Sequence, residues 1–159
     1  MTGARGRVGD VDWAGCLQRW SKDYEFAKSN QTTEFLAPHG LTDLTSKLAT
    51  VKWRYALTGS LAAQSFSPIA PARLGMVYVD DVETAVRTLD LREVDSGSNV
   101  LIAEPFDPVA YERTIKRDGI TLAAPTQIVA DLLTASGRMP SEGEELLAWM
   151  KDNERVWRG

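Results

Sequence analysis

The residues best suited to chemistry are Gly59 and Ser60, which lie between the apolar segment 53–57 and an Ala-rich stretch. A Gly-Ser pair at a helix start places free backbone N–H groups and a hydroxyl where a phosphate can bind. Asp80 and Asp81 end the next apolar segment, 74–79, and carboxylates at a strand end can hold a divalent cation. These four residues form a candidate nucleotide-binding site.

Nucleotidyltransferase domains share the order strand, Gly-Ser, helix and strand, with two alternating carboxylates on the second strand. Here Arg73 and Gly75 stand near those positions, and the adjacent Asp80 and Asp81 would point to opposite faces of an extended strand. Two-metal phosphoryl transfer needs both oxygens on one side. The pattern therefore favours an inactive relative of that fold, or a plain turn at Gly59, over an enzyme. One of the two aspartates is then expected to cap the helix over 82–89.

A second candidate surface is basic. Arg113, Lys116 and Arg117 lie close together in the sequence and can contact nucleic-acid phosphates. The alternative is a solvated surface face, because Glu112 and Asp118 dilute the positive charge. The sequence favours the solvated face.

No catalytic residue, cofactor or metal site is predicted. Cys16 and His39 are the chain's only Cys and His, and a structural zinc site needs more such ligands. A single cysteine also forms no internal disulfide, so we expect Cys16 to be a small core residue.

Helical periodicity dominates both ends of the chain. Apolar residues at 13, 17, 20 and 24 predict a helix over 10–26, a short helix is expected over 32–36, and 41–51 reads as a third helix capped by Thr42. Near the C-terminus, Thr126 is expected to cap a helix over 127–135, and Ser141 with Glu144 to form the capping box of the last helix. We expect the first and last helices to pack around the tryptophans. Asp131 either faces solvent or pairs with an arginine, because an unpaired buried carboxylate is costly.

The middle of the chain predicts a sheet. Strands are expected over 53–57, 74–79, 91–94 and 99–103, with 74–79 central because it is apolar throughout. Helices are expected from Ser60 and over 82–89. Asp118-Gly119 between 114–117 and 120–123 predicts a hairpin.

Length and composition place these elements in one domain. The chain has 159 residues, of which 43% are hydrophobic, and a net charge of −4, which argues against the whole chain being a nucleic-acid grip. The fold class is α+β, a mixed sheet of about five strands flanked by helices. We expect a disordered leader over 1–9 and a single domain over 10–159, with a helical lead-in (10–51), a sheet core (52–125) and C-terminal helices (126–159). No apolar run is long enough to cross a membrane, and a cytoplasmic setting fits best.

Several stretches carry a family resemblance that covers nearly the whole chain. They include YALTGSLAA at 55–63, PARL at 71–74, APTQ at 124–127, DLL at 131–133 and GRMPSEGE at 137–144. Residues 7–13, 149–150 and 153–158 fit as well. With these, the chain resembles the AbiEi-type antitoxins, transcriptional regulators of type IV toxin–antitoxin systems.

The resemblance implies a non-enzymatic antitoxin-like domain that acts against a nucleotidyltransferase-like toxin without forming a stable complex with it. Such proteins bind operator DNA through an N-terminal winged helix. No winged helix is legible before Asp10, so the chain resembles the C-terminal region alone, and DNA binding would come from a module that is missing here. Homodimer formation stays open, and no membrane contact is expected.

Overall fold

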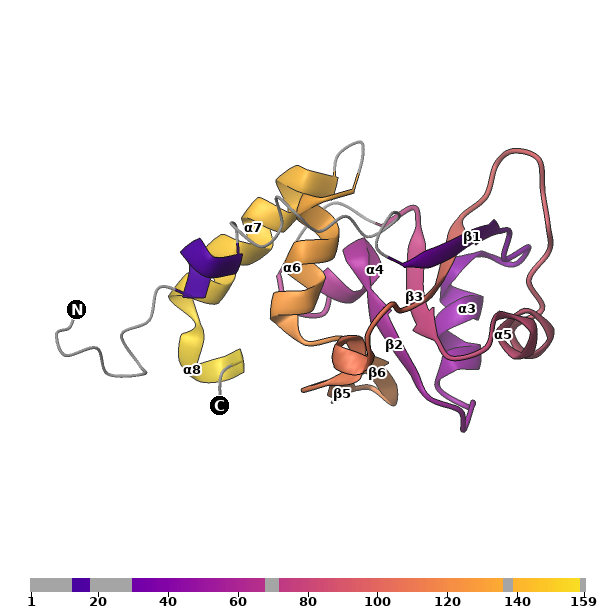
Figure 1. Cartoon of the computed structure of the whole chain (residues 1–159), viewed down its shortest axis with the longest axis horizontal. Coiled ribbons are helices and arrows are strands. Elements are labelled where there is room, and N and C mark those ends of the chain that lie inside the picture. The colour runs from indigo at the N-terminus through magenta and orange to yellow at the C-terminus, as the bar shows by residue number, and fades with distance from the viewer. Residues whose placement is uncertain (1–12, 18–29, 68–71, 136–138, 158–159) are drawn as a thin grey trace, which may run out of the picture.

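A six-stranded mixed sheet organises the protein (Figure 1). The structure is a computed structural model that describes residues 13–17, 30–67, 72–135 and 139–157. The strand order is β1-β4-β3-β2-β6-β5, in which β3 runs parallel to β4 and β2 runs parallel to β6, whereas the other pairs are antiparallel. The strands are β1 (Gln31–Phe35), β2 (Tyr55–Thr58), β3 (Gly75–Val79), β4 (Val100–Glu104), β5 (Ile115–Arg117) and β6 (Ile120–Leu122). The mixed α+β fold expected from the sequence is confirmed.

Helices cover the sheet on both sides (Figure 1). Helices α4 and α6 pack against β2, and α7 packs on both of them, whereas α3 and α5 contact each other on the opposite side. The helices are α3 (Gly40–Leu48), α4 (Gly59–Ala63), α5 (Val82–Leu89), α6 (Pro125–Leu133), α7 (Met139–Asp152) and α8 (Glu154–Trp157), with a 3-10 turn, η2, over Pro108–Tyr111. The core therefore lies on both faces of the central strands.

The predicted central strand is confirmed as β3, in which all five residues are buried. Its neighbour β2 is also buried throughout. Continuous burial explains why both strands read as unbroken apolar runs, since a strand covered on both faces has no solvent side to alternate with.

The predicted hairpin is confirmed as well. Strands β5 and β6 pair antiparallel around Asp118 and Gly119, whose φ angles are +53° and +80°. Two consecutive left-handed residues form the turn whose twist matches the flanking strands, and Asp-Gly tolerates that conformation.

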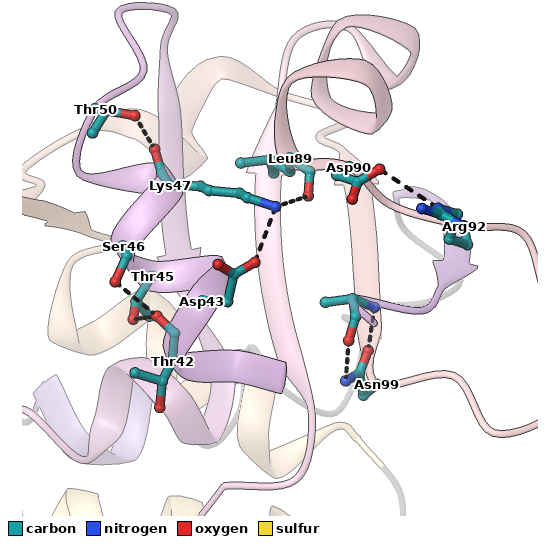
Figure 2. Close-up of polar contacts among 11 residues, drawn as sticks. Thr42, Asp43, Thr45, Ser46, Lys47, Thr50, Leu89, Asp90, Arg92 and Asn99 are labelled. Carbon is teal, nitrogen blue, oxygen red and sulfur yellow. Dashed lines mark hydrogen bonds and ion pairs between the residues drawn. The ribbon is translucent and has the colours of Figure 1, made fainter. Parts of the chain in front are cut away.

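The predicted helix over 32–36 is wrong, because this segment forms strand β1. Five residues are too few for a helical period to be reliable, and β1 gains its hydrogen bonds by pairing with β4, with Gln31 opposite Glu104. The Asn99 side chain fixes the end of this pairing (Figure 2). It accepts from the Ala37 N–H at 2.7 Å and donates to the Ala37 carbonyl at 3.2 Å.

The predicted strand over 91–94 is also wrong. Here the chain makes a single antiparallel bridge, in which Leu36 and Arg92 exchange backbone hydrogen bonds of 2.8 and 2.9 Å. The segment follows directly on α5, whose last turn ends in a left-handed residue, Asp90, with φ +54°.

The observed helix caps lie two or three residues before the predicted ones, at His39 for α3 and at Ala124 for α6. Helix α3 begins at Gly40, so Thr42 lies within its first turn, where its carbonyl accepts from the Thr45 hydroxyl at 2.9 Å. Thr126 likewise lies inside α6, which begins at Pro125, a residue suited to the first helical position. Helix α7 begins at Met139, so Ser141 is not its cap and the predicted capping box is wrong.

Helices α3 and α5 are joined by one lysine (Figure 2). The Lys47 ammonium lies 2.9 Å from the Asp43 carboxylate on its own helix and 3.5 Å from the carbonyl of Leu89 at the end of α5. A cation at a helix C-terminus also offsets the negative end of the helix dipole. The contacts of Lys47 with Asp43 and with the Leu89 carbonyl therefore link α3 to the end of α5.

The two ends of the described chain pack together, as the tryptophan pattern predicts. Residues 13–17 are helical, and the Trp13 and Trp157 rings meet edge to face with centroids 4.9 Å apart. The Trp13 indole N–H donates to the Glu154 carboxylate at 3.1 Å. Cys16 is exposed, so its predicted core position is wrong. Trp20, Tyr24 and the predicted 1–9 leader lie outside the described residues.

Candidate functional site

The Gly59-Ser60 turn joins β2 to α4 at a crowded point of the core. Gly59 has φ +71°, and a Cβ built there would lie 2.5 Å from the Met76 sulfur. A side chain is therefore disfavoured both by backbone strain and by contact. The predicted strand–turn–helix arrangement is confirmed, and this position favours glycine.

The polar side chains on either side of Gly59 form hydrogen bonds with buried carboxylates. The Ser60 hydroxyl donates to a carboxylate oxygen of Glu142 on α7, and both residues are buried. The Thr58 hydroxyl donates to Asp131 on α6 at 2.6 Å. Each side of the turn is thereby tied to a C-terminal helix.

Asp131 lies at the centre of a buried polar cluster. It is fully buried, and its carboxylate also accepts from the Tyr78 hydroxyl at 2.8 Å and from the Gln127 amide at 3.0 Å. Of the two alternatives drawn from the sequence, the solvent-facing one is wrong. Donors from β2, β3 and α6 offset part of the cost of burying this carboxylate.

Asp80 and Asp81 follow the end of β3 that is distant from the Gly59 turn. In the antiparallel pairing Thr58 faces Met76, whereas Tyr55 faces Val79, so Asp80 lies four residues beyond the level of Thr58, the last strand residue before the Gly59 turn. At about 3.3 Å per residue this is about 13 Å. The structure does not bring the Gly-Ser pair and the two aspartates together.

Each aspartate has a local partner instead. Asp80 accepts two hydrogen bonds from Arg54, at 2.9 and 3.1 Å, and this pairing lowers the pKa of Asp80 below its ordinary value. Asp81 precedes α5 and accepts from the Thr84 hydroxyl at 2.6 Å, which lowers the pKa of Asp81. Both carboxylates therefore remain ionised at neutral pH.

The three predicted basic residues do not converge. Arg113 borders a hollow near Trp157, Lys116 borders one near Trp53, and Arg117 borders a third near Leu61. The Arg117 guanidinium lies 4.5 Å from the centre of the Phe66 ring and donates to the Ser65 carbonyl at 2.6 Å. Although they are close in the sequence, the three side chains border three different hollows.

Comparison with known proteins places the chain in a family. A family described as "Transcriptional regulator, AbiEi antitoxin, Type IV TA system" matches residues 11–146. The chain belongs to the AbiEi antitoxin family. No curated protein and no solved structure is significantly similar to it.

The AbiEi match contains the whole sheet, the Gly59 turn and both of its carboxylate partners, Asp131 and Glu142. It ends within α7. It supports the role of a type IV antitoxin and transcriptional regulator.

Two structural facts concern the metal and nucleotidyltransferase interpretations, within the described part of this AbiEi-family chain. No group of three or more His, Cys, Asp or Glu side chains could hold a metal ion there. Gly75, one of the positions where a nucleotidyltransferase would carry a carboxylate, lies against the side chains of Leu41 and Leu44.

Among the residues that the structure describes, no helix is long and apolar enough to span a membrane.

Sequence reasoning missed one arrangement in this AbiEi-family protein. The Arg54 guanidinium lies 4.0 Å from the centre of the Tyr111 ring, while Asp80 holds it from the side. The run of alternating charged and aromatic residues, Lys52, Trp53, Arg54 and Tyr55, was a usable signal, since it concentrates cations and aromatic rings in one short segment. The partners 26 and 57 residues away left no such signal.

Proposed function

We propose that this chain is the antitoxin-like domain of an AbiEi-type regulator and that it acts without catalysing a reaction. It opposes a nucleotidyltransferase-like toxin, and it counters the effect of that toxin without forming a stable complex with it. The family supports the regulatory role. The contact that supports a non-enzymatic role is the buried hydrogen bond from Ser60 to Glu142.

That contact bears on the enzyme alternative, a nucleotidyltransferase that uses Gly59-Ser60 and Asp80/Asp81. A phosphate held at the turn would need the Ser60 hydroxyl, which here lies 3% exposed against a carboxylate. A carboxylate beside the turn repels a phosphate by Coulomb's law. The remaining pair of aspartates lies at the far end of the strand.

DNA binding is proposed to come from a separate winged-helix module. Arg113, Lys116 and Arg117 border three different hollows, so they do not form one surface for a duplex. An operator-binding assay with the present chain alone is expected to give no sequence-specific complex. A specific complex would overturn this part of the proposal.

The decisive experiment is toxin rescue in cells. Co-expression of this chain with its cognate toxin is expected to restore growth. The Asp81→Asn variant is expected to rescue equally well, because Asp81 is exposed at the N-terminus of α5 and its carboxylate bonds to the Thr84 hydroxyl of the same helix. Thr88→Val is the matched control on the exposed side of the same helix, and immunoblots check the level of each variant.

Two outcomes would contradict the proposal. Unchanged growth arrest with a well-expressed wild-type chain would reject the antitoxin role. Magnesium-dependent transfer of a labelled nucleotide that disappears in Asp81→Asn would establish the enzyme alternative, because a residue with only a structural role at a helix terminus has no part in the transfer of a phosphoryl group.

A further inference from the structure

A hollow of about 300 Å³ lies between the end of α3, the start of β2 and the β5–β6 hairpin. Its lining combines three cations with three aromatic residues and contains no carboxylate. The members are Lys52, Trp53, Arg54, Tyr55, Tyr111 and Lys116. In a chain with a net charge of −4, Lys52 and Lys116 make this surface locally positive, because the Asp80 carboxylate pairs with Arg54.

Arg54 forms a fixed, flat surface at the edge of this hollow. Asp80 accepts two hydrogen bonds from its guanidinium, and the Tyr111 ring lies 4.0 Å below it. Two restraints from different directions hold the guanidinium plane in one orientation. The side chain is nevertheless 55% exposed, so the face away from Tyr111 is accessible. Guanidinium planes held in this way stack on nucleobases.

Lys52 and Lys116 provide charge that is not neutralised. Both are exposed, and neither forms an ion pair with another described residue, in contrast to Lys47, which pairs with Asp43. Lysine ammonium groups bind phosphate as mobile point charges. They reach the hollow from two segments, the turn before β2 and the hairpin strand β5.

We propose that this hollow binds a nucleoside phosphate, with the phosphate on Lys52 and Lys116 and the base stacked on Arg54. The cations supply attraction for the anion, and the guanidinium plane supplies the surface for the base. Duplex DNA is not the expected ligand, because its bases are already stacked within the helix. This inference depends on the hollow and not on the antitoxin role.

The nucleotide has two sources, a free mononucleotide or one unit of a single strand. A second hollow of about 520 Å³ shares Arg54 and Tyr111 with the first and is bordered by Phe106, whose ring is 60% exposed. An exposed ring next to a nucleotide site can stack the neighbouring base of a strand. Phe106 therefore distinguishes the two sources.

Isothermal titration with AMP, ADP, inorganic phosphate, a single-stranded 10-mer and a 10-base-pair duplex tests the proposal. AMP or ADP is expected to bind more tightly than phosphate alone, with an affinity that falls as salt rises. The Lys52→Ala/Lys116→Ala double variant is expected to lose at least about tenfold in affinity. The control is Arg87→Ala/Lys151→Ala, which removes the same charge at exposed positions outside the hollow. It is expected to bind as the wild type does.

Arg54→Lys separates stacking from charge, because it keeps the cation and removes the flat surface. We expect it to bring the affinity for AMP down to that for phosphate. If the 10-mer binds more tightly than AMP and Phe106→Ala removes only that gain, the source is a single strand. If the 10-mer gains nothing, the source is a free nucleotide.

Four results would overturn the inference. They are no binding of any nucleotide, equal binding of phosphate and AMP, tightest binding of the duplex, or wild-type affinity in the Lys52→Ala/Lys116→Ala variant. Thermal melting of each variant checks that a lost affinity does not come from unfolding.

Discussion

The Thr58 hydroxyl donates a 2.6 Å hydrogen bond to the carboxylate of Asp131, 73 residues further along the chain. Both residues are fully buried. The bond joins Thr58, the last residue of β2 and the residue before Gly59, to the last turn of α6. The adjacent bond from Ser60 to Glu142 does the same for α7. The turn is thus the point at which both C-terminal helices are held to the sheet.

Replacing Thr58 with valine is expected to destabilise the fold. Thr58→Val keeps the shape of the side chain and removes one donor from a buried carboxylate, which costs about 1–3 kcal/mol in the free energy of unfolding. Urea denaturation measures the change. The control Thr88→Val removes an exposed hydroxyl that bonds within its own helix, and it should stay within about 0.5 kcal/mol. Equal losses at both positions would contradict the role given to Thr58.

The Ser60–Glu142 contact is expected to give a measurable coupling energy. Ser60→Ala alone leaves a buried carboxylate with one donor fewer, and Glu142→Gln alone weakens the same bond. The two losses should therefore not add in the double variant, with a coupling of about 0.5–3 kcal/mol between these residues. A double-mutant cycle by chemical denaturation measures it. Strict additivity would mean that the two side chains do not interact in solution.

Gly59→Ala and Gly97→Ala form a matched pair. Both glycines have positive φ, +71° and +76°, so each alanine carries the strain of a left-handed residue, about 1–2 kcal/mol. Only at Gly59 does the new Cβ also meet the Met76 side chain. Gly59→Ala should therefore lower the melting temperature more than Gly97→Ala. A similar loss at both sites would show that Met76 moves aside without cost.

The pKa of Asp80 is expected to rise toward its ordinary value of 3.8 when Arg54 is replaced by glutamine. In the wild type the folded-state pKa is lowered, chiefly by the bonds from Arg54. The resulting stabilisation is present above the unfolded-state pKa and is lost as the pH falls through the lowered folded-state value. NMR titration of the side-chain carboxyl carbons measures both aspartates. The pKa of Asp81 depends chiefly on Thr84, so it should stay unchanged as the internal control.

Where local signals are strong, the sequence predicts the fold correctly. Strand β3 is apolar over its whole length, and the Asp118-Gly119 turn requires left-handed residues that few other pairs supply. Where an element depends on a distant partner, the prediction fails. Strand β1 is stabilised by pairing with β4 about 70 residues away, and nothing within its five residues distinguishes a strand from one helical turn.

The same division applies to the candidate sites. The Gly59 turn could be predicted, because a Gly-Ser pair after an apolar run indicates a tight turn by itself. The hydrogen bonds from Thr58 to Asp131 and from Ser60 to Glu142 could not be predicted, because these carboxylates lie more than 70 residues away along the chain. The basic triplet, which the sequence favoured as a solvated face, borders three different hollows for a related reason. Neighbours on β5 alternate between the two faces of the sheet, so Lys116 separates from Arg117.

The sequence by itself determined the family, the α+β class and the positions of most elements, since periodicity, turn chemistry and family motifs are local or statistical properties of the chain. Only the tertiary structure decided which polar side chains stabilise the core and which cations share one hollow. Burial and proximity arise when distant segments pack, and no spacing along the chain records them.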